Sequence, residues 1–317
     1  MSEQASGQSA ETPEQSPDRW TAPRKIARQV VQVLYYSVKD LATDNGPHWA
    51  AALSYYALLS IFPMLLAIVS IASYFVDPQW AVGQATGLLG EFLPEGRELV
   101  EETVRALMED RGPASILSIL ALLWTGSRVF RALTLALNIA YDTEETYGFG
   151  KRILMELAMM LTLGVLFVLA LASGPLLRLL GRALGALPGE RGFAFGLITA
   201  AVPAVLLLAA LFLIYRFVPR TRTEWKSALT GALAATGLFM LARPLFGYYV
   251  QEFAGYSLVY GSLSIVIVLL VWAWLGAMIV ILGGEIASHV QMIVIEGKSP
   301  EEVKRRHEAR SPERRPG

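Results

Sequence analysis

The sequence predicts an all-α, polytopic membrane protein, and both its composition and its apolar segments indicate this class. Of its 317 residues, 54% are hydrophobic and 17% are charged, whereas soluble domains usually carry about 25% charged residues. Six apolar blocks are long enough to cross a bilayer as helices, because about 20 apolar residues span the hydrocarbon core. The blocks cover residues 49–76, 114–137, 153–180, 193–217, 225–250 and 259–290.

The distribution of cations predicts the orientation of these six spans. With the amino terminus inside, 20 of the 27 lysines and arginines fall on the inner side and 6 on the outer side. Arg243 lies within a span and belongs to neither group. Since lysine and arginine accumulate in cytoplasmic loops, we expect both termini in the cytoplasm.

Outside the spans, the polar segments predict two tails, an entry helix and one large loop. Residues 1–23 are rich in Ser, Gln, Glu, Pro and Thr, which is typical of a disordered cytoplasmic tail. The membrane domain covers residues 24–295, and a charged cytoplasmic tail covers 296–317. Apolar residues between Arg24 and Thr43 repeat at helical spacing, so this helix either packs on the bundle or lies on the membrane surface. The outer loop 77–113 holds eight acids and is expected to cap the bundle with a solvated, amphipathic helix face.

Composition also excludes several kinds of site. Equal numbers of basic and acidic residues, 27 of each, leave no basic field for nucleic acid. The absence of cysteine excludes disulfides, thiolate nucleophiles and cysteine-based zinc sites. The three histidines, His48, His289 and His307, are too far apart in sequence to form a local metal motif. We therefore expect no metal, no cofactor and no nucleic-acid partner, with membrane lipids as the surroundings.

Ionisable residues inside the predicted spans are the candidate functional residues, because charge at membrane depth is costly. Helical rise places four of them at similar depths in the inner half of the membrane. Asn138 shares a helix face with the two arginines of this group. The candidate polar site thus comprises Arg128, Arg131, Asn138, Glu156 and Glu285.

Two interpretations of this site remain open. In one, Arg–Glu pairs hold helices together, or the arginines extend to the inner headgroups. In the other, Arg128 and Arg131 offer forked donors to an anionic headgroup or substrate. The structural interpretation is favoured, because buried ion pairs also occur for packing reasons.

Arg243 is a second candidate, in the outer half of its span. It is followed by Pro244, which removes a backbone donor and can kink the helix beside the arginine. Small residues in the last two spans predict close helix packing instead of catalysis. These small residues are Ser227, Gly231 and Ala235 in one span and Gly276, Gly283 and Gly284 in the other.

Several segments, in this order, resemble those of a bacterial family. They are Asp44-Asn45, Ala50-Ala51-Ala52-Leu53-Ser54-Tyr55-Tyr56, Phe62-Pro63, Leu123-Trp124 with Arg128, Ala136-Leu137-Asn138 with Tyr141, Tyr260-Gly261-Ser262-Leu263 and Leu282-Gly283-Gly284-Glu285. Over about residues 25–295 the chain resembles the YihY/BrkB family, which was once misassigned as ribonuclease BN. The family commonly has Gly-Ala-Glu where Gly283-Gly284-Glu285 stands here. The resemblance implies six transmembrane helices, an inner-membrane location and a role in the cell envelope.

The leading functional hypothesis is export or flipping of a lipid or another amphiphilic anion. The inner-half arginines and proline-containing spans support it, and without a P-loop such transport needs a gradient, a partner or passive exchange. The alternative is a structural or assembly factor of the envelope without transport activity. A nuclease is disfavoured, because metal-dependent RNA hydrolysis needs clustered His or carboxylate ligands. The sequence thus predicts a protein that is not an enzyme.

Overall fold

The computed structural model describes residues 21–72, 113–143, 148–183, 193–252, 263–298 and 302. In chain order its helices are α1 (Thr21–Thr43), α2 (Gly46–Ala72), α5 (Pro113–Ala140), α6 (Phe149–Ala183), α7 (Phe193–Phe217), α8 (Trp225–Glu252) and α10 (Leu263–His289). A π-helical segment, Val290–Ile295, directly follows α10. No strand occurs in the described part of the chain, so the predicted all-α class is confirmed.

Each of the six predicted apolar blocks corresponds to one helix, from α2 to α10. The block 193–217 has the same bounds as α7, and the other bounds differ by a few residues at their ends. Three windows within the described ranges are long and apolar enough to cross a membrane: Ile153–Ala170, Trp225–Val250 and Val266–Ile295. Six spans and cytoplasmic termini therefore stay predictions. The amino-terminal tail, the acidic loop 77–113 and most of the carboxyl-terminal tail lie largely outside the described residues.

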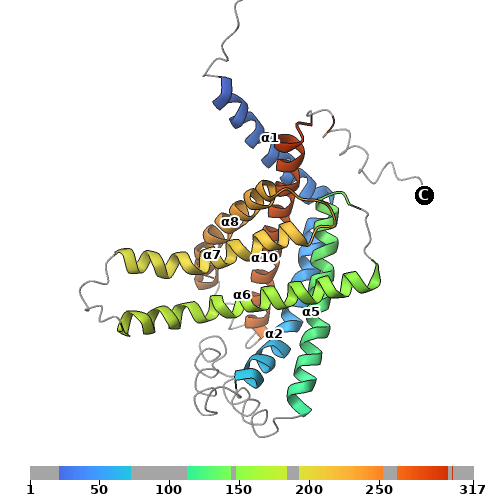
Figure 1. The fold of residues 1–317 in the computed structure, drawn as a ribbon. Helices are drawn as coiled ribbons and strands as arrows, with labels where there is room; N and C mark the ends of the chain where they lie inside the picture. Colours follow the sequence, from blue (N-terminus) through green and yellow to red (C-terminus); the bar gives the residue numbers. More distant parts are fainter. Residues whose placement is uncertain are drawn as a thin grey trace, which may run out of the picture.

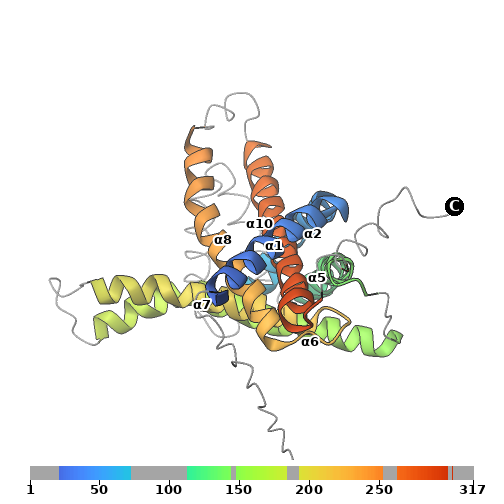
Figure 2. The same ribbon diagram turned by 90° about the horizontal axis from the view of Figure 1, so that it is seen from above.

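Helix α10 lies at the centre of the molecule, where it contacts α1, α2, α5, α7 and α8. Figure 1 shows α2 and α5 running alongside each other, with α1 crossing the end of α10. Helices α6 and α7 lie side by side and extend together to one side of the molecule in both views, and α6 also crosses α5 (Figures 1 and 2). The molecule thus has a packed centre around α10 and a projecting pair of helices.

Small residues bring the backbones of α8 and α10 into contact. A Cβ atom added to Gly231 would lie 2.7 Å from Cβ of Ala287, and one added to Gly283 would lie 2.8 Å from Cβ of Ala235. The hydroxyl of Ser227 donates a hydrogen bond of 2.6 Å to the carbonyl oxygen of Ala287. The close packing predicted from these small residues is therefore confirmed.

A tight turn between α1 and α2 sets the position of α1. Asn45 has a φ of 58°, in the left-handed region that asparagine adopts more readily than most residues. Gly46 follows it, and a Cβ atom there would lie 2.5 Å from the carbonyl oxygen of Leu41. No larger residue fits this turn without a shift of α1. The Asp44-Asn45 pair thus lies at the point where α1 folds back onto the bundle.

The entry helix predicted from residue 24 to residue 43 is present as α1. One face packs on α10, where Val33 joins a buried cluster with Ile286 and Ile293. Ser37 and Asp40 are buried on the same helix. The opposite face exposes apolar side chains, namely Val30, Val31, Leu34, Tyr35 and Val38. Helix α1 therefore packs on the bundle and also presents an apolar outer face.

Candidate functional site

The two arginines of α5 lie on an exposed and mainly apolar helix face, the α5 face. Its members are the exposed side chains of Leu120, Trp124, Arg128, Arg131 and Leu135. The guanidinium of Arg128 lies 5.5 Å from the centroid of the Trp124 ring, within cation–π range. Aromatic and aliphatic side chains thus flank two exposed cations.

Asn138 does not continue this face, although the sequence placed all three residues in one stripe. It is buried, and its Oδ1 atom accepts a hydrogen bond of 3.0 Å from the backbone N–H of Arg220. Asn138 therefore joins the end of α5 to the segment after α7. The structure separates the exposed arginines from this buried polar contact.

Glu156 lies in a pocket between α5, α6 and the segment after α7. Arg220, in the segment after α7, lines the same pocket. The lining residues are Phe130, Thr134, Met155, Glu156, Met159, Val218 and Arg220. Arg128 and Arg131 are not among them, so the structure does not bring these arginines to Glu156 in this pocket.

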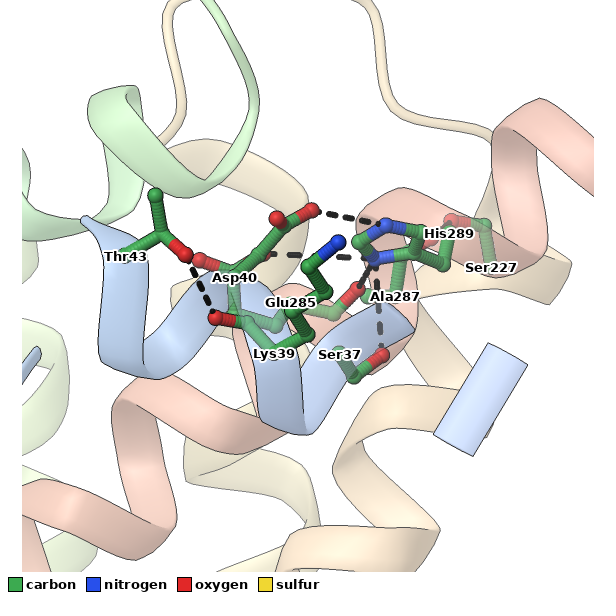
Figure 3. A network of polar contacts seen from close by, with 8 residues as sticks. All are labelled: Ser37, Lys39, Asp40, Thr43, Ser227, Glu285, Ala287 and His289. Carbon is green, nitrogen blue, oxygen red and sulfur yellow. Dashed lines mark hydrogen bonds and ion pairs between the residues drawn. The ribbon is translucent and has the colours of Figure 1, made fainter. Parts of the chain in front are cut away.

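Glu285 lies in a buried polar cluster with Asp40 of α1 and His289 at the end of α10, which we call the Asp–Glu–His cluster. Exposed fractions are 3% for Asp40 and 1% for both Glu285 and His289. The Nε2 atom of His289 lies 3.0 Å from Oδ2 of Asp40, and Nδ1 lies 4.0 Å from Oε2 of Glu285. Figure 3 shows these contacts converging on the imidazole ring. The cluster joins the first helix to the last.

The backbone of α10 orients the imidazole of His289. Its Nδ1 atom lies 2.9 Å from the carbonyl oxygen of Glu285, one helical turn earlier, so this nitrogen carries the proton and donates it. The hydroxyl of Ser37 lies 3.4 Å from the same nitrogen, and the ring of Tyr36 stacks on the imidazole with an interplanar angle of 7°. Nε2 is consequently directed toward Asp40.

The Asp–Glu–His cluster has the donor set of a metal site. One ligand atom from each side chain can be chosen so that all three lie within 4.8 Å of one another. No other such group of His, Asp or Glu occurs among the residues that the structure describes. An imidazole nitrogen with two carboxylates can hold a divalent cation or share a proton.

Tyr141, just beyond the end of α5, lies near this cluster. It is buried and packs with Ala287 of α10. Burial raises the pKa of its phenol, the hydroxyl of Thr223 partly offsets this, and the charge of Glu285 raises the pKa further. The phenol therefore stays neutral at ordinary pH and remains a potential hydrogen-bond donor beside Glu285.

Sequence reasoning found Glu285 but missed Asp40 and His289. One local signal was present, because Glu285 and His289 are four residues apart and share a face of α10. Nothing local pairs His289 with Asp40, which is 249 residues earlier and approaches it only because α1 folds onto α10.

Arg243 and Pro244 are both exposed on α8, which continues as a helix to Glu252. Ser227, near the start of the same helix, contacts Ala287 beside the Asp–Glu–His cluster. The helical rise puts Arg243 about 24 Å farther along α8 than Ser227. Arg243 is therefore remote from this cluster.

Comparison with known proteins supports one family. Residues 37–309 match the family model described as Virulence factor BrkB. The chain is 31% identical over 252 residues to the Putative ribonuclease-like protein YfkH of Bacillus subtilis, covering 76% of this chain and 89% of that protein. It is 30% identical over 269 residues to a UPF0761 membrane protein of Azotobacter vinelandii, covering 80% of this chain and 62% of the relative.

A UPF0761 membrane protein of Photobacterium profundum is 28% identical over 272 residues, which cover 82% of this chain and 81% of the relative. No solved structure matches the chain. The ribonuclease-like name is that of the Bacillus protein and is not carried over to this chain. Since the family model matches most of the chain, and the similar proteins include UPF0761 membrane proteins, this chain belongs to the BrkB family of membrane proteins.

Proposed function

We propose that this protein is a multi-pass protein of the bacterial inner membrane that exports or flips a lipid or another amphiphilic anion. It has six spanning helices, both termini lie in the cytoplasm, and it performs no chemical reaction on its ligand. The α5 face, with Trp124, Arg128 and Arg131 exposed together, is the observation that carries this proposal.

The α5 face matches both parts of an amphiphilic anion. A guanidinium offers paired donors that fit the oxygens of a phosphate or carboxylate headgroup. The exposed side chains of Leu120, Trp124 and Leu135 provide apolar surface for acyl chains. An exposed arginine on an apolar helix is costly in a bilayer unless an anion or water reaches it, and an anionic headgroup supplies that partner.

Reconstitution into vesicles tests the proposal. The purified full chain is placed in vesicles of phosphatidylethanolamine and phosphatidylglycerol that contain a fluorescent phosphatidylglycerol, and an impermeant reductant reports exchange between leaflets. We expect the protein to accelerate exchange, and Arg128→Ala to slow it about tenfold or more through loss of charged hydrogen bonds. Arg128→Lys should recover only part of the rate, because lysine keeps the charge but lacks the planar fork.

Arg222→Ala is the matched control, since Arg222 is also exposed but lies in the connection after α7. It should exchange lipid at the unmodified rate. Equal rates for empty vesicles and vesicles with the protein would contradict the proposal. If Arg128→Ala instead lowers folded abundance and the protein moves no lipid, the α5 face serves assembly and the alternative of a structural factor is correct.

The proposed orientation has its own test. The chain contains no cysteine, so a single cysteine can be introduced at any position without background labelling. In intact cells, an impermeant thiol reagent should label a cysteine placed between residues 91 and 111 but not one placed at Gly317. The opposite pattern would overturn the orientation while leaving the lipid-exchange result unaffected.

A further inference from the structure

We propose that Asp40, Glu285 and His289 bind one divalent transition-metal ion, with Zn²⁺ as the first candidate, and that the ion fastens α1 to α10. The proposal is independent of lipid movement, because it rests on residues that are separate from the α5 face. It assigns a site to a cluster that links two ends of the membrane domain.

The charge of the cluster favours a divalent cation. When both carboxylates are ionised and the imidazole is neutral, the cluster carries a total charge of −2, and all three side chains are almost completely buried. Charges removed from water are destabilising unless they are compensated nearby. One divalent ion neutralises the cluster, whereas one proton leaves a negative charge in the interior.

The orientation of His289 favours a metal over a simple hydrogen bond. Because Nδ1 donates to the carbonyl oxygen of Glu285, the neutral ring has its lone pair on Nε2. Nε2 lies 3.0 Å from a carboxylate oxygen of Asp40, yet it makes no hydrogen bond of acceptable geometry to any described residue. In that tautomer two electron-rich atoms at this separation repel unless a cation lies between them, and the poor hydrogen-bond geometry favours a metal ion over a proton in that place. Metal-binding histidines typically donate their second nitrogen to a carbonyl in this way.

The spacing of the donors fits a small transition-metal ion. Zinc binds nitrogen and oxygen at about 2.0–2.2 Å, so two ligand atoms of a tetrahedral site lie about 3.3–3.6 Å apart. The 3.0 Å between His289 and Asp40 is close to this, and a carboxylate oxygen of Glu285 lies within 4.8 Å of the other two ligand atoms. An imidazole ligand favours zinc, iron or nickel over magnesium and calcium.

Such an ion would act as a structural link. Asp40 belongs to α1, whereas Glu285 and His289 belong to α10, so separation of the two helices destroys the site. An ion that binds only the folded state raises the free energy of unfolding, and the increase grows with the logarithm of the ratio of ion concentration to Kd. We therefore expect α1 to detach more readily from the bundle when the metal is removed.

Metal binding by the purified full-length protein, free of any histidine tag, tests this inference. After removal of metals with EDTA, calorimetric titration with ZnCl₂ in detergent should show one Zn²⁺ bound per chain, and the melting temperature should rise. Asp40→Asn and His289→Gln should each weaken binding by more than about 100-fold, since loss of even outer-shell partners costs 10- to 100-fold. His48→Gln is the matched control, because His48 is exposed on α2.

If a variant does not fold, X-ray absorption at the zinc edge of the unmodified protein tests the ligand set of the site directly. The spectrum should show one imidazole and otherwise oxygen ligands at about 2.0–2.2 Å. Absence of stoichiometric binding, more than one imidazole ligand, or equal loss of binding in His48→Gln would overturn the proposal. Stability that responds to pH but not to Zn²⁺ would show a proton-binding cluster instead. Arg128→Ala should bind Zn²⁺ normally, so failure of the lipid proposal would not affect this result.

Discussion

The carboxyl-terminal part of α10 and the helix α6 are both apolar, but their side chains have opposite surroundings. From Gly283 to His289 every residue of α10 is buried, although this stretch contains two glycines, a serine, a glutamate and a histidine. Helix α6 instead exposes large aliphatic side chains: Leu154, Leu157, Leu161, Val165, Val168 and Leu169. In these two stretches, small and polar residues make the contacts of α10 with other helices, whereas the large aliphatic residues of α6 are exposed on the outside of the molecule, as expected for a surface that faces lipid.

The difference in burial between α10 and α6 has a physical basis. Within a bilayer, lipid chains are as apolar as leucine, so a leucine between helices gains little from leaving lipid and contributes through close packing with its neighbours. Small residues allow backbones to approach, and polar groups find hydrogen bonds only in protein surroundings. Ser227 illustrates this, because its hydroxyl reaches the carbonyl oxygen of Ala287 across the α8–α10 contact.

The largest effect that tests the comparison is expected from a leucine at the packed centre. Leu137 of α5 is 0% exposed and lies against Gly284 of α10, so Leu137→Ala should lower the free energy of unfolding by about 2–5 kcal/mol. Leu161→Ala on α6, where the side chain is 72% exposed, should change it by less than about 0.5 kcal/mol. Equilibrium unfolding in detergent measures both. Equal losses would show that α6 is packed as tightly as α5.

A smaller effect, with opposite signs in the two regions, is expected from glycine substitutions. Gly283→Ala places a methyl group against Tyr215 and Ala235, which should destabilise the protein by about 1–3 kcal/mol. Gly164→Ala on α6 meets nothing within 4 Å and should stabilise it by about 0.5–1 kcal/mol, because alanine is the better helix former. Thermal unfolding of the two variants checks the signs, and a stabilised Gly283→Ala variant would contradict close contact of α8 with α10.

The smallest effect is expected from a pair of hydroxyl groups. Ser227→Ala removes the hydrogen bond of 2.6 Å between α8 and α10 and should cost about 1 kcal/mol. Thr162→Ala on α6 removes only an exposed bond to the carbonyl oxygen of Ala158 in the same helix, so little change is expected. Chemical denaturation in the same detergent compares them. A larger loss for Thr162→Ala would place an unrecognised helix contact on α6.

Patterns along the chain were enough to predict the helices and one of their contacts. Apolar blocks of sufficient length predict the helices α2, α5, α6, α7, α8 and α10. An apolar segment in a bilayer forms a helix because its backbone groups can then hydrogen-bond within the segment itself, so the signal lies in nearby residues. The small residues of α8 and α10 predicted their close approach for a similar reason, since regular spacing places such residues on one helix face. Both signals are local and can be recognised along the chain.

Only the tertiary structure decided which polar residues meet. Arg128 and Asn138 share a predicted stripe, yet the first is exposed and the second is buried against the backbone of Arg220, because neighbouring elements cover only part of α5. Asp40 meets His289 because the turn at Asn45 folds α1 back toward α10. Contacts between residues so far apart depend on how whole helices pack, and that packing has no signature in the residues near either one.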